Sequence, residues 1–306
     1  MEFLYLLEGL RNPVLDKIML TITTFGEETV FLVLSLYLLW CVDKYYGYYI
    51  LSVGFIGTQL NQLLKVIFKI DRPWVRDPSF TTVEGATEAA GGYSFPSGHT
   101  QSATGCFGAI ARWTKNNILR IVSILMILLV AFSRMYLGVH TPADVITSLI
   151  IGSVLVFALY PIFRKARENY KVMQWFIGIM LLWSFIQILF MEFFPFSDGL
   201  NETELLSGLK NAYKMAGAVS GFAVMFELDR RYIKFETKAV WWAQIIKLVG
   251  GLSLTIAVKN ICYAVFGLIP HEPFSRFLSY FFMVLFATCV WPLTFRFFSK
   301  LDKNKR

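Results

Sequence analysis

Long apolar runs recur along almost the whole chain and limit the structures it can adopt. Of the 306 residues, 56% are hydrophobic and only 16% are charged. A helix needs about 20 apolar residues to cross a bilayer, and backbone polar groups in lipid must be bonded within the chain. The sequence therefore predicts an all-α, polytopic transmembrane helical bundle. Its nine predicted spans are 18–42, 46–68, 97–113, 118–136, 141–163, 172–194, 212–228, 240–267 and 275–298.

Residues 1–17 lack the basic-then-apolar layout of a signal peptide. We expect them to form a short amphipathic segment at the membrane interface. The span at 97–113 is rich in small residues, which favours close packing of this helix. The four cysteines all fall in apolar runs without metal-ligand spacing, which indicates packing residues.

Basic residues set the predicted orientation in the membrane. The net charge of +8 does not indicate nucleic-acid binding, because the cations sit in short clusters beside apolar segments. Under the positive-inside rule these clusters are cytoplasmic, the amino terminus is outside and the carboxy terminus is inside. The acidic loop 196–204 then lies outside. The basic clusters are Lys44; Arg112, Lys115 and Arg120; Arg164, Lys165, Arg167 and Lys171; Arg230, Arg231, Lys234 and Lys238; and Arg296, Lys300, Lys303, Lys305 and Arg306.

The first of three polar motifs contains Lys65 and, seven residues later, Arg72. Two helical turns separate them, so both cations are predicted to project from one helical face. The Arg72 guanidinium offers a planar fork of donors to phosphate oxygens, and Lys65 offers a point charge. Pro73 is expected to end the helix. The alternative is a pair of snorkelling cations at the membrane boundary.

The second motif, Pro96-Ser97-Gly98-His99, follows a small-residue-rich loop at 77–93 that we interpret as a lid. Ser97 is a good helix N-cap, and Gly98 lets a ligand approach the backbone closely. The amides of both residues are expected to bind an anion at the helix start. His99 would face the same anion. An ordinary helix cap with an incidental histidine is the alternative.

The third motif runs from Ser133-Arg134 to His140 and Asp144. Gly138 permits a tight turn, and Thr141 is expected to cap the next helix with proline at its first position. Asp144 then lies in the first helical turn, where it can hold the His140 imidazole in one tautomer. A capping-box role of Asp144 with Thr141 is compatible with this.

Together the motifs indicate phosphoryl chemistry. His140, when neutral, is the predicted nucleophile, and His99 the acid that protonates the leaving oxygen. Lys65, Arg72 and Arg134 would bind the phosphoryl oxygens. Because no carboxylate or cysteine cluster has metal-ligand spacing, we predict neither a metal nor another cofactor.

These blocks resemble the type 2 phosphatidic acid phosphatase (PAP2) superfamily, whose pattern is K-x6-RP, then PSGH, then SR-x5-H-x3-D. The sequence matches every fixed position. The resemblance covers residues 18–163 and implies a PAP2-type catalytic core, a phosphohistidine on His140, acid catalysis by His99 and no metal requirement. Residues 164–306 would form a C-terminal extension of about four more transmembrane helices, with no role indicated.

The leading hypothesis is a membrane lipid phosphatase that cleaves a phosphate monoester or pyrophosphate at the extracytoplasmic face of a bacterial plasma membrane. A phosphotransferase that passes the phosphoryl group to another lipid or sugar is a second hypothesis. A non-catalytic phospholipid carrier is a third, although a pure binder would need only the cations. The expected partners are the bilayer and a lipid phosphate, without nucleic acid, and a homo-oligomer is left open.

Overall fold

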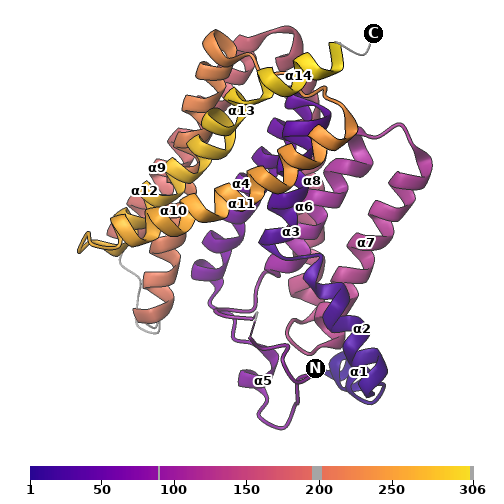
Figure 1. Ribbon diagram of the computed structural model, residues 1–306. Coiled ribbons are helices and arrows are strands. Elements are labelled where there is room, and N and C mark those ends of the chain that lie inside the picture. The colour runs from indigo at the N-terminus through magenta and orange to yellow at the C-terminus, as the bar shows by residue number, and fades with distance from the viewer. Residues whose placement is uncertain (89, 195–201, 304–306) are drawn as a thin grey trace. The chain divides into compact units, whose positions relative to one another are not determined.

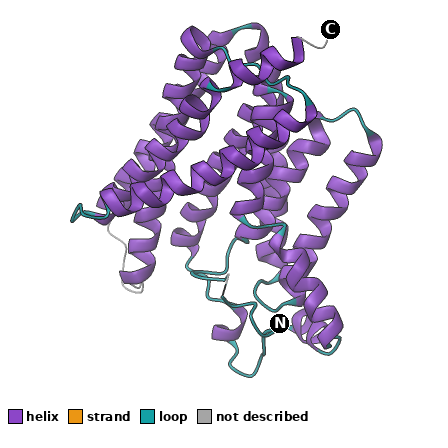
Figure 2. Cartoon of the chain, in the orientation of Figure 1, coloured by secondary structure: helices purple, strands orange, loops and turns teal. Residues whose placement is uncertain are grey.

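The computed structural model describes residues 1–88, 90–194 and 202–303, and within them all regular structure is helical (Figure 2). The predicted acidic loop 196–204 lies mostly outside this range, as do Lys305 and Arg306. Figure 1 labels the α-helices, which are α1 (Glu2–Glu8), α2 (Pro13–Thr24), α3 (Glu28–Tyr37), α4 (Lys44–Phe68), α5 (Pro73–Arg76), α6 (Gly98–Trp113), α7 (Asn117–Tyr136), α8 (Pro142–Glu168), α9 (Tyr170–Phe193), α10 (Glu202–Leu228), α11 (Trp241–Phe266), α12 (Glu272–Leu285), α13 (Trp291–Leu293) and α14 (Phe295–Lys303). Short π-helical turns occupy Leu38–Val42, Asp229–Ile233 and Phe286–Val290.

The chain forms two compact units. The first comprises Met1–Leu34 and Tyr49–Pro161, and the second comprises Ser35–Tyr48 and Ile162–Arg306. The division near residue 161 falls close to the expected limit of the catalytic core at residue 163. Residues 35–48 fall inside the predicted core of 18–163 but belong to the second unit.

The described helices include fewer membrane spans than the nine predicted. Six are long and apolar enough to cross a bilayer, or up to seven if a bent pair counts as one span. Helix α6 has 16 residues, about 24 Å at the usual helical rise, whereas the hydrocarbon core is about 30 Å thick. Helix α10 is long enough, but it is not among the helices that are apolar enough.

The first predicted span, 18–42, is not one straight helix. Helix α2 already begins at Pro13, inside the segment expected at the interface, and the α2 and α3 axes differ by 48°. The break falls at Gly26, where the backbone is pressed against another helix. A side chain there would come within 2.9 Å of the His99 carbonyl oxygen and 2.8 Å of Val130 Cγ1.

Small residues bring α6 close to its neighbours in the first unit, which confirms the expected close packing. A methyl group at Gly105 would approach Val53 of α4 at 3.1 Å, and one at Gly108 would approach Val156 of α8 at 3.2 Å. Helix α6 therefore lies against α4 and α8 with little room for larger side chains. This packing fixes the start of α6, where the second motif lies.

Helix α10 packs closely on α12 in the second unit. A side chain at Gly217 would overlap the Phe277 backbone, and one at Gly221 would approach the Phe281 carbonyl oxygen at 2.9 Å. In the π-helical turn that follows α10, buried Asp229 accepts hydrogen bonds from Lys44 Nζ at 2.7 and 3.0 Å. The second unit thus combines small-residue helix packing with an internal ion pair.

Candidate active site

The three motifs converge at one end of the first unit. They occupy the end of α4, the start of α6, the end of α7 and the start of α8. In Figure 1 this end carries α1 and α5, and the connection from α6 to α7 lies at the opposite end of the unit. Burying charged groups is costly unless they are paired or bind a ligand. Lys65, Arg72, Arg134, His140 and Asp144 are only 8, 6, 1, 1 and 1% exposed.

The first motif reaches the site by a different path from the one predicted. Helix α4 ends at Phe68, and Lys69 adopts a left-handed conformation with φ of 48°. Arg72 lies beyond the helix in extended backbone. The expectation that Lys65 and Arg72 share a helical face is therefore wrong. Pro73 does not end α4 but opens the short helix α5.

Both cations nevertheless contact the same stretch of the loop that follows them, just before the second motif. Lys65 Nζ donates to the carbonyl oxygen of Tyr93. Arg72 Nε donates to Gly92 O at 2.9 Å, and its Nη2 donates to Gly91 O at 2.7 Å. These carbonyls hold the two cations in place. The lid role of this loop stays a prediction.

Arg72 also contacts the predicted nucleophile. Its Nη1 lies 2.9 Å from His140 Nε2 and donates to Val139 O at 3.0 Å. Burial and the positive charge of Arg72 hold the pKa of His140 well below its ordinary range. The imidazole is therefore neutral, which is the form that can attack phosphorus.

The other nitrogen of His140 faces Asp144. His140 Nδ1 lies 3.4 Å from Asp144 Oδ2, and the same oxygen accepts the Thr141 amide at 2.7 Å. Thr141 Oγ1 in turn accepts the Asp144 amide at 3.4 Å. The predicted capping box is confirmed, and the carboxylate also faces the imidazole.

Ser94 is a member of this site that the sequence analysis missed. Its hydroxyl is fully buried, donates to Asp144 Oδ2 at 2.6 Å and lies 3.4 Å from His140 Nδ1. Its amide donates to Ile70 O at 2.7 Å, which ties it to the first motif. A serine just before the second motif is the only trace in the sequence, because its orientation depends on tertiary packing.

The second motif begins a helix as predicted. Ser97 Oγ accepts the Thr100 amide at 3.4 Å and the Thr100 hydroxyl at 3.0 Å. The Ser97 amide, however, donates to the Asp144 carbonyl oxygen at 3.2 Å, so the expected bond from this amide to an anion has a competitor. At Gly98 an added methyl group would approach Asn61 Oδ1 only at 3.9 Å, which leaves this backbone accessible.

Two buried groups have donors or acceptors that the described part of the chain does not satisfy. His99 Nε2 has no hydrogen-bond partner there, and neither do Nε and Nη2 of Arg134. The Arg134 guanidinium is held at Nη1, which donates to Thr23 Oγ1 of α2 at 2.7 Å. Because buried unsatisfied donors cost free energy, these groups are suited to receive an anionic ligand.

Buried cations and two histidines lie together at one end of an apolar helical unit, and this arrangement is typical of a membrane phosphatase. Residues 44–168 match the PAP2 superfamily, and residues 213–304 match the transmembrane extension of PAP2 superfamily phosphatases. The chain belongs to the PAP2 superfamily and is a membrane lipid phosphatase of PAP2 type. All eight predicted site residues fall inside the 44–168 match, namely Lys65, Arg72, Ser97, Gly98, His99, Arg134, His140 and Asp144.

Similar proteins come from bacteria, archaea and animals. Undecaprenyl-diphosphatase BcrC of Bacillus subtilis is 30% identical over 151 residues, which cover 49% of this chain and 75% of that protein. Undecaprenyl-diphosphatase of Sulfolobus acidocaldarius is 29% identical over 47% of this chain and 68% of its own length. Human sphingosine-1-phosphate phosphatase 2 is 25% identical over 44% of this chain and 35% of its own length. No solved structure matches the chain.

Proposed function

We propose that this protein hydrolyses a lipid phosphate monoester or diphosphate through a phosphohistidine on His140, at the extracytoplasmic face. The observation that carries the proposal is the setting of the imidazole. Its Nε2 meets the Arg72 guanidinium at 2.9 Å, and its Nδ1 faces Asp144 at 3.4 Å. One nitrogen is thus oriented by a carboxylate, and the other lies where a cation would hold a phosphoryl group.

In the first step the lone pair of His140 Nε2 attacks the terminal phosphorus. The bond from that phosphorus to the leaving oxygen breaks, which is the lipid oxygen of a monoester or the bridging oxygen of a diphosphate. His99 donates its proton to the departing oxygen. In the second step water attacks the phosphohistidine, His99 accepts a proton from that water, and the N–P bond breaks to release inorganic phosphate. His140 is thereby regenerated, and no oxidant or metal ion takes part in this balance.

Three cations hold the phosphoryl group in this mechanism. Arg134 has two unsatisfied guanidinium nitrogens, and Arg72 moves a donor from His140 Nε2 to a phosphoryl oxygen. Lys65 adds a third positive charge. Burial and the charges of Arg134, Arg72 and Lys65 lower the pKa of His99 to about 3. The negative charge of a bound phosphate acts in the opposite direction and favours a proton on His99. Substrate binding therefore favours the protonated form of His99 and also brings the phosphoryl group to the three cations.

The proposed face of the membrane follows from the distribution of charge in the first unit. The basic residues Arg112, Lys115 and Arg120 lie at the α6–α7 connection, at the end opposite the motifs. The positive-inside rule makes that connection cytoplasmic and the site extracytoplasmic. The similar proteins are named for undecaprenyl diphosphate and sphingosine 1-phosphate, which supports a lipid phosphate or diphosphate as the substrate.

The test measures phosphate release by the purified protein in detergent with EDTA. Undecaprenyl diphosphate, sphingosine 1-phosphate and phosphatidic acid serve as substrates, and His140→Ala is assayed beside the wild type. We expect release that survives EDTA and is lost in the variant. Equal release by His140→Ala would refute the nucleophile, and release that EDTA abolishes would refute the metal-free mechanism.

A further inference from the structure

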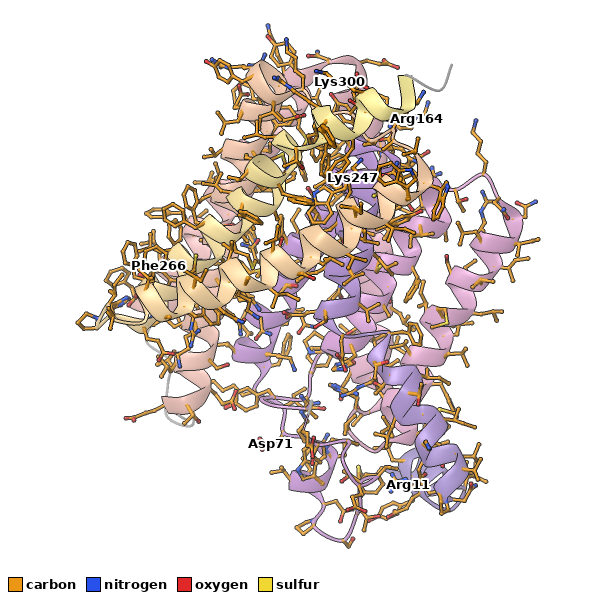
Figure 3. The ribbon with its side chains drawn as sticks, in the orientation of Figure 1. Arg11, Asp71, Arg164, Lys247, Phe266 and Lys300 are labelled. Atoms are coloured by element: carbon orange, nitrogen blue, oxygen red, sulfur yellow. The ribbon has the colours of Figure 1, made fainter. Side chains whose placement is uncertain are left out.

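Residues 1–28 form a strap along the site end of the first unit, and they lie outside the 44–168 family match. Arg11 contributes two of its contacts, with Nη1 donating to Thr81 O at 2.8 Å and Nε donating to Tyr136 O at 3.1 Å. Asp16 accepts the Tyr136 hydroxyl at 2.8 Å. Figure 3 places Arg11 at the same end of this unit as Asp71, which precedes the first-motif arginine. The strap therefore holds the end of α7, just before the turn to His140.

At its far end the strap contacts two of the predicted site residues. Thr23 is buried, and its hydroxyl accepts Arg134 Nη1 at 2.7 Å. Within the described part of the chain, this hydrogen bond holds the Arg134 side chain, and the donors at Nε and Nη2 are unsatisfied. A guanidinium is planar and rigid, so fixing one nitrogen fixes the direction of the others.

Three residues later the strap backbone contacts His99. At Gly26 an added methyl group would lie 2.9 Å from both His99 Cβ and the His99 carbonyl oxygen, and 2.8 Å from Val130 Cγ1. These distances are too short for a real side chain, so only glycine allows this approach. The 48° bend between α2 and α3 therefore places one turn of chain against both Arg134 and His99.

We propose that the α2–α3 elbow, residues 23–26, completes the active site, with Thr23 as the positioning residue for Arg134 and Gly26 as the support for His99. This inference rests on the proposed function, since it assigns Arg134 to the phosphoryl group and His99 to the leaving oxygen. Thr23 does not touch the substrate. The Thr23 hydroxyl fixes the direction of the two unsatisfied guanidinium nitrogens of Arg134. The backbone at Gly26 limits how far the His99 side chain can move away from the site.

The Thr23 test compares three variants with the wild type in detergent. Thr23→Val keeps the shape and removes the acceptor, Thr23→Ser keeps the acceptor, and Thr21→Val is a control whose exposed hydroxyl donates only to Lys17 O in its own helix. The readouts are the Kd of inorganic phosphate, kcat, KM and the melting temperature. We expect Thr23→Val to weaken phosphate binding about tenfold, as the loss of one hydrogen bond to a charged group implies.

Thr23→Ser and Thr21→Val should keep the wild-type phosphate Kd. If Thr23→Val does not fold, Thr23→Cys replaces it, because a thiol is a weak acceptor of similar size. A purely structural role would lower the melting temperature of Thr23→Val or Thr23→Cys and leave the phosphate Kd unchanged, and that result would overturn the assignment. A phosphate Kd weakened equally in Thr23→Ser would overturn it as well.

Gly26→Ala tests the other contact of the elbow. Because the added methyl group displaces His99 but does not touch a phosphate ligand, kcat should fall while the phosphate Kd stays within about twofold of wild type. Unchanged kcat in a folded Gly26→Ala protein would remove Gly26 from the proposal. His140→Ala distinguishes a failure of the proposed function from a failure of this inference. If it retains turnover, the proposed function fails, whereas if it is inactive and Thr23→Val behaves like Thr21→Val, only this inference fails.

Discussion

Replacing Asp144 by asparagine isolates the electrostatic contribution of the carboxylate to His140. Asp144 Oδ2 accepts the Ser94 hydroxyl and the Thr141 amide at 2.6 and 2.7 Å, and an asparagine oxygen can occupy the same position. The hydrogen-bond pattern survives in Asp144→Asn, and the negative charge is lost. Since Asp144 makes none of the proposed phosphate contacts, KM should change little.

The magnitude follows from the distance between His140 Nδ1 and Asp144 Oδ2. At 3.4 Å, two unit charges interact by about 5 kcal/mol with an effective dielectric constant of about 20. If about half a positive charge has developed on the imidazole in the transition state, the loss is about 2.4 kcal/mol, which lowers kcat about 60-fold. Lower dielectric constants in the site would increase this loss.

The assay is phosphate release at saturating substrate, with KM measured in parallel. Asp43→Asn is the matched control, because Asp43 forms an ion pair with Arg167 at 2.6 Å in the second unit. It should keep wild-type kcat. A kcat of Asp144→Asn within threefold of wild type would refute the electrostatic role of the carboxylate. A rise in KM at unchanged kcat would move Asp144 from chemistry to substrate binding.

Three further outcomes are expected. Protonated His140 cannot attack, and the pKa of His140 lies well below the ordinary 6.5. The acid limb of the pH profile of kcat/KM should therefore lie below pH 6.5. It should move to higher pH in Arg72→Gln, because this variant removes a positive charge beside the imidazole. Ser94→Ala alone should lower kcat about tenfold. In an Asp144→Asn background it should cause no further loss, because the Ser94 hydroxyl acts through that carboxylate. Additive losses of kcat in the double mutant would contradict this role. Gly217→Leu should lower the melting temperature, because α10 has no room for a side chain against the α12 backbone, and an unchanged melting curve would show that the two helices can separate.

Local patterns in the sequence predicted the parts of the site that depend on neighbouring residues. The capping box joins Thr141 and Asp144, which are three residues apart. The Ser97 cap likewise joins Ser97 and Thr100, and both caps form. Gly138 takes the left-handed conformation, with φ of 79°, that the tight turn requires. These features depend on hydrogen bonds within one turn of chain, which the residue types largely determine.

Contacts between distant segments were not predictable in this way. Lys69 ends α4 early by adopting a left-handed conformation. Lys65 and Arg72 therefore come together through the loop at 91–93, and the helical spacing could not show this. Thr23 lies 111 residues from Arg134 in the sequence, and no periodic pattern links them. Apolarity alone also overcounted the spans, because it does not reveal where a short or bent helix is packed within the protein.

A covalent phosphoryl group on His140 is the central claim, and trapping it is the most direct test. The wild type and His99→Ala would be mixed with substrate labelled in the transferred phosphate, quenched in alkali to preserve phosphohistidine, digested and analysed by mass spectrometry. We predict a phosphorylated peptide that contains His140 and is absent from His140→Ala. Turnover without label on that peptide, or label on another residue, would contradict the account.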